Sequence, residues 1–544
     1  MYSWNHPPPA YNHLDRRRET TTLPENLSPV PARAPLRSAL LLSSLFAALA
    51  FLAHLFSTLW GYHLGYGFDG DELYFLVCGH HLAWGFVDMP SLIALQARLA
   101  EMLFGLSPAG VRIFSFLAGG INVGLTGLLA WQLGGRRSAQ LLAMTAVLAA
   151  PVYLAASNYL SMVSFEPCFW MGPLFVLLRL ADGTASPRAW LIFGLLAGLG
   201  TENKHSTVFF LVALLAGLLL SPQRRLLRSR WCAAGVVLLI LLALPNFIWQ
   251  WVHHFPTYEL LSNIAHSDEN IKLPPLAFLA AQVNILFVVA APLWIGGLIW
   301  LAFARRARPW RFVALTYLLF LPMMMLMHAK HYYLAPIYPV FFAAGAVALD
   351  HLTLRRWPAI GYTVVLSCFF CLVTGPLVLT ILPPEKYNAY RAKTRLFLGD
   401  TEAQKGTSPL PTFHSHRFGW PQMVEGFAAR YNALPPDVRA HTAIFCGSYA
   451  EASAVNILGP KYGLPTAISG HQTYFYWGWN GYTGESVLTL GKDLKDYADN
   501  YAEVIDLGPF DAPWIQDNEH LRYLWLRHRK RTYAADWLEF KHWD

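Results

Sequence analysis

Four carboxylates lie close together near the start of a sequence that carries little charge. Asp69, Asp71 and Glu72 fall within four residues, and Asp88 follows in the same segment, 61–107. A well-placed carboxylate is a suitable general base for a hydroxyl group. The alternative is that the first three are solvated loop charges or helix caps, and capping explains Asp88 equally well. We interpret Asp71 and Glu72 as the strongest candidates for chemistry.

Glu166 is a second candidate because of its isolation. It is the only charged residue in the apolar stretch from Ala139 to Leu178. An unpaired glutamate in hydrocarbon costs at least a few kcal/mol. The residue must therefore face a polar cavity or a partner, and a structural hydrogen bond to a neighbouring helix is the alternative.

Two lysines supply the complementary charge. Lys204 lies in a Glu-Asn-Lys-His segment, and Lys330 lies in a His-Ala-Lys-His-Tyr-Tyr segment. Lysine is a suitable point charge for phosphate, although an isolated lysine at the end of a membrane span often extends to the interface. The tyrosines after Lys330 are also typical of an interfacial aromatic belt. Carboxylates and lysines in one pocket would suit group transfer from a phosphate-linked donor, with a base on the acceptor hydroxyl and cations on the departing phosphate.

The elements that position these residues are predicted to be membrane helices. The chain has 544 residues, of which 55% are hydrophobic and 14% are charged. A soluble domain usually has about 25% charged residues, so the composition predicts a polytopic membrane protein. We expect eleven spans. They lie near residues 38–60, 108–133, 139–157, 163–180, 189–201, 204–220, 231–250, 276–303, 311–328, 332–350 and 358–381.

The positive residues predict the orientation of these spans. With the N-terminus inside, the inner segments carry 19 Lys and Arg residues and the outer loops carry 4. Loops on the cytoplasmic side are enriched in Lys and Arg, and an odd number of spans then places the C-terminal tail outside. The formal charge of +8 reflects this orientation toward an anionic inner leaflet. We therefore expect no nucleic-acid partner.

Three parts follow from this reading. They are a cytoplasmic leader (1–37), a transmembrane catalytic domain (38–382) with a first outer loop (61–107), and an extracytoplasmic α/β domain (383–544). In the first outer loop, apolar residues at helical spacing predict two helices at the membrane surface. The Asp/Glu cluster would cap the first helix, and Asp88 would open the second.

The C-terminal tail differs in composition from the rest of the chain. It is polar, with short apolar runs at 442–446 and 486–490 that predict buried strands. The segment 449–458 between them is predicted to be a helix. The tail is therefore expected to form a small α/β domain.

The motifs resemble those of GT-C glycosyltransferases of the protein-mannosyltransferase type, which include the bacterial aminoarabinose transferases of lipid A. That family has an Asp-Glu pair in its first outer loop, as in Asp71-Glu72, and then an acidic residue before a Pro-Pro-Leu motif. Asp88 stands in that acidic position, and Ser91 replaces the second proline. The resemblance covers roughly residues 38–350 and implies a GT-C-like α-helical membrane fold. Later family elements match Glu166 near the start of a span, Glu202-Asn-Lys204-His205, and Lys330-His331-Tyr332-Tyr333-Leu-Ala-Pro336.

The resemblance implies sugar transfer, with inversion, from a polyprenyl-phosphate donor to a hydroxyl acceptor in the cell envelope. The acceptor would be a lipid, a glycan or a protein, and the enzyme would lie in the plasma membrane. Asp71 would act as the base or position the acceptor, supported by Glu72, and Glu166 would organise the acceptor side or a cation. The remaining residues implied are Lys204, Lys330 and Tyr332 at the donor phosphate, and Asp69, Asp88, His205 and His331 in positioning donor or acceptor.

Metal dependence and one other function class stay open. Asp69-Gly-Asp71 matches a DxD pattern that some glycosyltransferases use to hold a divalent cation, and His266-Ser-Asp268-Glu269 is a second cluster of oxygen and nitrogen donors.

The alternative function is a transporter or flippase of a lipid-linked or anionic solute. Such proteins more often show internal repeats and broken helices at the membrane midplane. A non-catalytic anchor for the tail would not explain Glu166.

Overall fold

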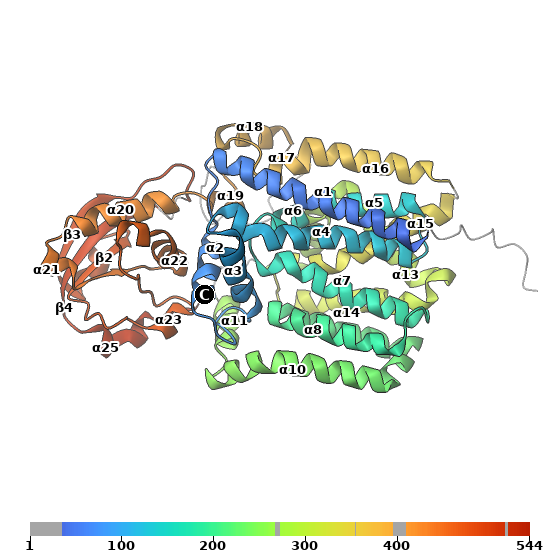
Figure 1. Ribbon diagram of the computed structural model, residues 1–544, viewed down its shortest axis with the longest axis horizontal. Coiled ribbons are helices and arrows are strands. Elements are labelled where there is room, and N and C mark those ends of the chain that lie inside the picture. The colour runs from blue at the N-terminus through green and yellow to red at the C-terminus, as the bar shows by residue number, and fades with distance from the viewer. Residues whose placement is uncertain (1–34, 267–271, 354, 395–409, 517–519, 544) are drawn as a thin grey trace, which may run out of the picture.

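The protein consists of a body of long helices with a smaller sheet-containing region at one end (Figure 1). The structure is a computed structural model that describes residues 35–266, 272–353, 355–394, 410–516 and 520–543. The predicted leader lies outside these residues, except for its last three positions.

Seven helices in the described part of the chain are long and apolar enough to cross a membrane, and each coincides with a predicted span. Two of these spans begin with a 3₁₀ helix, η4 (Arg305–Trp310) before α14 and η5 (His331–Ile337) before α15. The seven spans are α1 (Leu36–His63), α4 (Pro108–Gln132), α7 (Met162–Ala181), α10 (Arg230–Val252), η4 with α14 (Arg311–Leu326), η5 with α15 (Tyr338–Thr353), and the span Trp357–Val378, which contains α16 (Trp357–Phe369) and α17 (Gly375–Val378).

Three further predicted spans are bent helix pairs. Each pair is bent by 67° to 112° at a break of a few residues, and Pro151 and Pro222 begin the second helix of two of the pairs. Proline is tolerated in the first turn of a helix, but it lacks the N–H that would continue the helix before it. The pairs are α5 (Arg137–Ala149) with α6 (Pro151–Ser157), α9 (Ser206–Leu219) with η2 (Pro222–Arg228), and α12 (Pro275–Ile285) with η3 (Val288–Ala290) and α13 (Ala291–Phe303).

The span predicted at 189–201 is the exception. It forms α8 (Trp190–Asn203), whose 14 residues rise only about 21 Å, less than the ~30 Å hydrocarbon core. In the described chain, up to ten segments are therefore long and apolar enough to cross a membrane, whereas eleven were predicted. α8 still contacts other parts of the body, since it packs along α10 and its Glu202 accepts a hydrogen bond from Ser91.

The first outer loop forms two helices, as the sequence predicts. They are α2 (Gly70–His80) and α3 (Leu92–Phe104), and both lie at the end of the body next to the sheet (Figure 1). Asp69 is the N-cap residue of α2. Asp88 does not cap α3, because its carboxylate accepts a hydrogen bond from Tyr74 instead.

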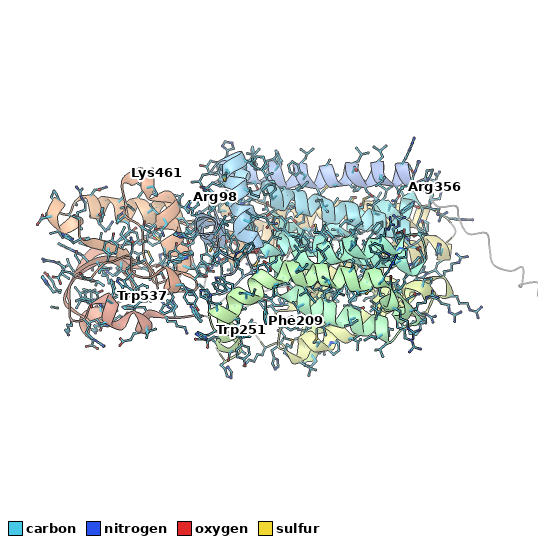
Figure 2. All side chains as sticks on the ribbon, turned by 60° about the horizontal axis from the view of Figure 1, so that its bottom comes forward. Arg98, Phe209, Trp251, Arg356, Lys461 and Trp537 are labelled. Carbon is cyan, nitrogen blue, oxygen red and sulfur yellow. The ribbon has the colours of Figure 1, made fainter. Side chains whose placement is uncertain are left out.

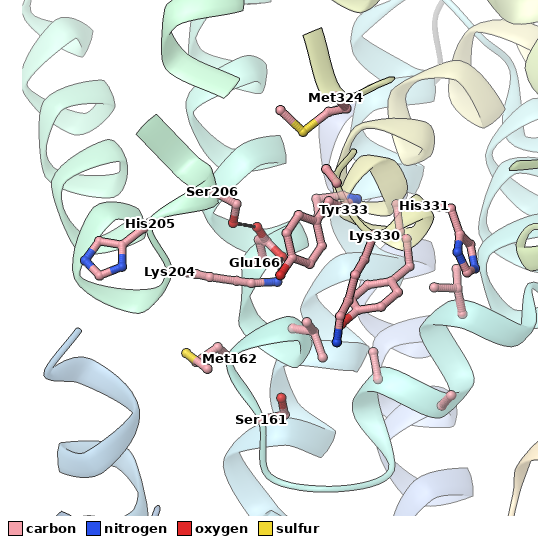
Figure 3. Close-up of a pocket in the computed structure, with 18 of the residues that line it drawn as sticks. Ser161, Met162, Glu166, Lys204, His205, Ser206, Met324, Lys330, His331 and Tyr333 are labelled. Atoms are coloured by element: carbon pink, nitrogen blue, oxygen red, sulfur yellow. Dashed lines mark hydrogen bonds and ion pairs between the residues drawn. The ribbon is translucent and has the colours of Figure 1, made fainter. Parts of the chain in front are cut away.

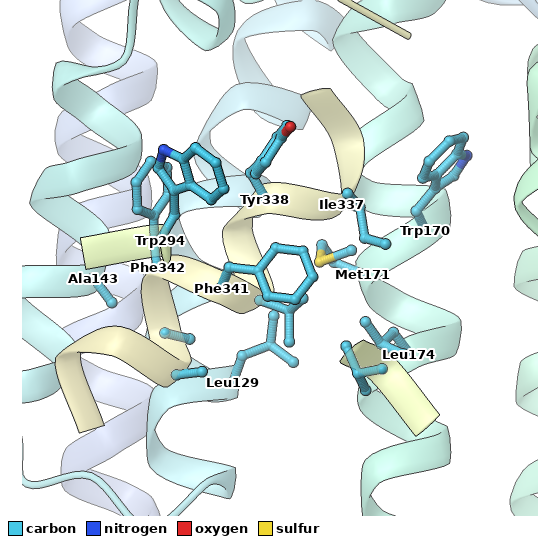
Figure 4. Close-up of a cluster of buried hydrophobic side chains, with 14 of the residues drawn as sticks. Leu129, Ala143, Trp170, Met171, Leu174, Trp294, Ile337, Tyr338, Phe341 and Phe342 are labelled. Carbon is cyan, nitrogen blue, oxygen red and sulfur yellow. The ribbon is translucent and has the colours of Figure 1, made fainter. Parts of the chain in front are cut away.

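The core of the helical body is apolar and aromatic. Tyr338 of α15 packs on Trp294 of α13, and the same buried cluster contains Phe341 and Phe342 of α15 and Trp170 of α7 (Figure 4). Two glycines let α13 and α15 approach closely, since a Cβ at Gly345 would clash with the carbonyl group of Leu293. Small residues at such contacts are typical of helix packing in membranes, where van der Waals contact replaces the hydrophobic effect.

The C-terminal domain (residues 410–543) contains a four-stranded mixed sheet in the order β1-β2-β4-β3. β1 (Thr442–Phe445) pairs in parallel with β2 (Ser486–Gly491), β2 pairs antiparallel with β4 (Arg522–Arg529), and β4 pairs antiparallel with β3 (Tyr501–Pro509). The helix α22 (Tyr449–Leu458) follows β1. The predictions of β1, β2 and α22 are confirmed, whereas β3 and β4 were not predicted.

The C-terminal domain packs on the first outer loop. α22 contacts α2, and Figure 2 shows Lys461 and Trp537 of this domain at one end of the molecule and Arg356 at the far end of the helical body. Arg98 of α3 lies between them, near the domain. The carboxylates of the first outer loop therefore lie at the junction of the two regions.

Candidate functional site

A reciprocal capping arrangement fixes the start of α2. The Asp69 carboxylate accepts from the backbone N–H of Asp71 at 3.1 Å, and the Glu72 carboxylate accepts from the backbone N–H of Asp69 at 2.8 Å. Such a capping box satisfies N–H groups that have no partner within the helix. Asp71 is therefore held in a rigid first turn, while its own side chain takes no part in the cap.

Glu72 is fully buried and forms an ion pair with Arg112 of α4. The guanidinium Nε and Nη2 donate to the two carboxylate oxygens, both at 2.7 Å, and the N–H of Leu160 donates to Oε1 at 2.7 Å. Arg112 Nη2 also donates to the Gly67 carbonyl at 2.8 Å. Glu72 does not line the pocket described below. It joins the first loop to α4 and supports the position of Asp71.

Asp71 and Asp88 present carboxylates toward one pocket. The Tyr449 hydroxyl, from α22 of the C-terminal domain, donates to Asp71 Oδ1 at 2.8 Å. The Tyr74 hydroxyl donates to Asp88 Oδ1 at 2.9 Å and lies 2.8 Å from Thr473 Oγ1. Both first-loop acids that line the pocket are therefore held by hydroxyl groups.

Burial raises the pKa of two carboxyl groups in the first loop, those of Asp88 and Asp69. It raises the pKa of Asp88 to about 6, and the hydrogen bond from Tyr74 opposes that shift. It likewise raises the pKa of Asp69 to about 6, and the neighbouring Asp71 adds to the rise. Desolvation disfavours the charged form of a carboxyl group. Carboxylates that titrate this close to neutral pH are common at functional sites.

Glu166 and Lys204 form the second polar group of the pocket. Glu166 of α7 accepts from the Ser206 hydroxyl on one oxygen, and Lys204 Nζ lies 3.3 Å from the other. The Lys204 ammonium also lies over the ring of Tyr333 at 4.3 Å from the centroid and 5.8 Å from that of Tyr332. The buried glutamate is thus paired, as the cost of an isolated charge in a membrane requires. Figure 3 shows this group together with Lys330.

One pocket with a cavity volume of about 620 Å³ joins these groups. Its walls come from the first loop, α6, α7, α14, η5, and the amphipathic α11 (Pro256–His266). Among the predicted site residues, Asp69 and Glu72 do not line it. Those that do are Asp71, Asp88, Glu166, Lys204, His205, Lys330, His331 and Tyr332.

The arrangement brings acids and cations to the same cavity, as the sequence hypothesis requires. Sequence reasoning missed Ser206, Tyr333, Tyr74 and Tyr449. Ser206 directly follows the predicted His205, and Tyr333 stands in the matched element after Lys330 but was given no role. Tyr449 gives no comparable signal, because its contact with Asp71 spans 378 residues of sequence.

No metal centre is evident in the described part of the chain. No three His, Cys, Asp or Glu side chains are grouped there as they would be to hold an ion. The predicted DxD pattern uses its first carboxylate as a helix cap. Asp268 and Glu269 of the second predicted cluster lie outside the described residues.

Comparisons with known proteins agree with this fold. Residues 88–249 match the sequence model of the family described as dolichyl-phosphate-mannose-protein mannosyltransferase, and no curated protein matches the chain. The crystal structure of ArnT from Cupriavidus metallidurans in the apo state is similar at 15% identity and a TM-score of 0.59. The same protein bound to undecaprenyl phosphate is similar at 16% identity and a TM-score of 0.58. Both structural matches cover 88% of this chain and 97% of the ArnT chain.

The predicted fold class is confirmed by these comparisons. The chain has the GT-C fold, a multi-pass membrane body of helices, with a small mixed-sheet domain after it. The sequence match falls on α3 to α10, which carry Glu166 and Lys204. Fold and sequence match together support the predicted class, a membrane glycosyltransferase of the protein-mannosyltransferase and aminoarabinose-transferase type.

Proposed function

We propose that this protein transfers a sugar from a polyprenyl-phosphate donor to a hydroxyl acceptor in the cell envelope. The observation that carries the proposal is the meeting of Asp71 and Asp88 with Lys204 and Lys330 around one cavity. A similar protein has been solved with undecaprenyl phosphate bound. That lipid is therefore a suitable probe for the donor site of this chain.

The residues divide the reaction between them. Asp71 takes the proton of the acceptor hydroxyl as its oxygen forms a bond to the anomeric carbon. The bond between that carbon and the phosphate oxygen breaks, and the electron pair leaves with the polyprenyl phosphate. Lys330 and Lys204 stabilise the negative charge of the departing phosphate. Attack opposite the leaving group inverts the anomeric centre.

The membrane orientation forms part of the proposal. We place the N-terminus in the cytoplasm and the C-terminal domain outside a plasma membrane, following the excess of basic residues in the inner segments. Arg356 lies at the end of the body remote from the C-terminal domain (Figure 2), in keeping with that orientation. The pocket would then open where a lipid-linked sugar meets an envelope acceptor.

Mass spectrometry of envelope glycolipids and glycoproteins tests the proposal. Cells with the wild-type gene should carry a sugar that is missing from cells without the gene, and this identifies donor and acceptor together. Asp71→Asn should abolish the modification, with a loss of roughly 10²- to 10⁴-fold for a lost general base. Asp437→Asn, an exposed residue of the C-terminal domain, is the matched control and should keep full transfer.

Two results would count against the proposal. An unchanged set of envelope sugars with the protein present at normal level would exclude transfer. Transfer that survives Asp71→Asn would exclude the assigned base. A transporter or flippase would instead alter the distribution of a lipid across the membrane without forming a new glycosidic bond.

A further inference from the structure

The C-terminal domain contacts Asp71 directly and reaches Asp88 through Tyr74. Tyr449 donates to Asp71, and Thr473 lies within hydrogen-bond distance of Tyr74, which donates to Asp88. We propose that the C-terminal domain is part of the catalytic site and that Tyr449 is a positioning residue for Asp71. The proposal rests on the function proposed above and adds a second region of the chain to it.

Tyr449 is held rigidly in its place. It is the first residue of α22, directly after the N-cap Ser448, which forms a capping box with Glu451. Its backbone N–H donates to His471 Nδ1 at 3.3 Å, and its ring packs against the rings of His471 and Tyr74, at centroid distances of 4.9 and 4.7 Å. Packing therefore already fixes the Tyr449 side chain, so its hydrogen bond to Asp71 costs little additional side-chain entropy.

The hydroxyl of Tyr449 fixes one oxygen of the Asp71 carboxylate. The charge of Asp71 and burial raise the pKa of Tyr449 well above its ordinary value, so the hydroxyl keeps its proton and donates it. In the part of the chain that the structure describes, Oδ1 carries this hydrogen bond and Oδ2 has none. Oδ2 is thus the oxygen that can take the acceptor proton. A base misplaced by about 1 Å can cost on the order of 10²-fold in rate.

A second chain of hydrogen bonds runs from the same domain to Asp88. The Val87 N–H donates to Thr473 Oγ1 at 3.1 Å, and the Thr473 and Tyr74 hydroxyl oxygens lie 2.8 Å apart. Tyr74 has a single hydroxyl proton, which it donates to the Asp88 carboxylate at 2.9 Å. The two acids are therefore oriented by the docking of one domain, through two separate hydroxyl groups.

The competing explanation is that Tyr449 only helps the domain to dock. Docking contacts affect stability and donor affinity along with transfer, whereas a positioning contact affects transfer alone. Tyr449→Phe removes the hydroxyl and keeps the ring that packs on Tyr74. Tyr523→Phe is the matched control, since its buried hydroxyl donates to the Met423 carbonyl at 2.9 Å within the same domain.

The test uses the full-length protein in membrane vesicles. The initial rate of transfer to the modified envelope product is measured by mass spectrometry, beside thermal stability and affinity for undecaprenyl phosphate. We expect Tyr449→Phe to lower the rate by roughly 10- to 100-fold, the range for a hydrogen bond to a charged group. Its stability and its affinity for undecaprenyl phosphate should match those of Tyr523→Phe, which should transfer at the wild-type rate.

Each other outcome is decisive. Wild-type transfer by Tyr449→Phe would overturn the proposal, and so would a loss of transfer that is matched by losses of stability and affinity. If Tyr449→Phe does not accumulate, Tyr449→His, which keeps a ring with a donor, must retain more transfer per folded molecule than Tyr449→Leu. Absence of transfer in the wild type would refute the proposed function instead. If the wild type transfers and Asp71→Asn does not, the proposed function stands, and Tyr449→Phe then tests the positioning role alone.

Discussion

The two sides of the pocket are held in different ways. On the acid side, Asp71 and Asp88 depend on hydroxyl groups, one of which comes from the C-terminal domain. On the cation side, Lys204 is held by Glu166 and by the ring of Tyr333, all within the membrane body. The acid side is therefore assembled by domain docking, and the cation side by packing of membrane helices.

The contrast shows how position sets the role of a charge. Asp71 and Glu72 are adjacent in sequence, yet Glu72 is bound by Arg112 and by two backbone N–H groups, while Asp71 lines the pocket. Lys204 and Lys330 differ likewise, since Lys204 is paired and Lys330 is exposed. On the acid side, Glu72 is bound within the protein and Asp71 lines the pocket, whereas on the cation side both lysines line the pocket and Lys204 is also paired with Glu166.

Glu72→Gln should have the largest effect on stability. It leaves the Arg112 guanidinium, 1% exposed, without its counter-charge, and breaking a buried pair costs about 3–5 kcal/mol. Thermal unfolding of the purified protein measures the loss. Glu101→Gln, in the partly exposed pair with Arg98 of the same loop, should cost less than about 1 kcal/mol. Equal losses in the two variants would contradict the structural role of Glu72.

Asp69→Asn tests the acid side through its pH dependence. Burial raises the pKa of Asp69 to about 6, from 3.8. The folded state therefore binds this proton more tightly than the unfolded state, and the free energy of unfolding falls as pH rises from about 4 to about 6. Asparagine keeps the N-cap and removes the charge. The variant should equal wild type below about pH 4 and exceed it above pH 6, by on the order of 2–3 kcal/mol.

Thermal unfolding between pH 4 and 8 measures this difference. Asp437→Asn, at an exposed position, is the control for removing a carboxylate far from this cap. A difference between Asp69→Asn and wild type that stays constant across this range would show that Asp69 is not titrating in the folded protein.

Lys330→Gln probes the cation side. Lys330 is exposed toward the pocket, whereas Lys204 is already paired. We expect the Kd for undecaprenyl phosphate to rise about tenfold, or about 1.4 kcal/mol, with a smaller ratio at high salt because exposed charges are screened. Lys461→Gln, an exposed lysine of the C-terminal domain, should leave the Kd unchanged. A salt-independent effect would point to a steric cause.

The cation side was the more predictable from sequence. A charge such as Glu166 stands out in an apolar run, because an unpaired charge there is costly and needs a partner. The surface helices α2 and α3 and the strands β1 and β2 also follow from local patterns of polarity. The acid side shows its carboxylates in the sequence but not their partners.

What was missed depends on long-range packing. Tyr449 is a tyrosine at the start of a small helix until that helix docks on α2, and no local pattern records the docking. β3 is mostly half-buried or exposed, so it lacks the buried apolar run that identified β2. Hydropathy also did not show the bends in three spans or the short length of α8.

Ser91→Ala should have the smallest effect, and it tests whether the two sides are joined. Ser91 stands where the resembled family has a proline, and its hydroxyl donates to Glu202 Oε2 at 2.7 Å. Glu202 lies two residues before Lys204, so this bond links the first loop to the cation side. Its loss should cost about 1 kcal/mol of stability and lower transfer by a few-fold. Ser38→Ala, whose hydroxyl contacts only a backbone carbonyl of its own helix start, is the control. Unchanged transfer in Ser91→Ala would mean that the acid and cation sides are positioned independently at this contact.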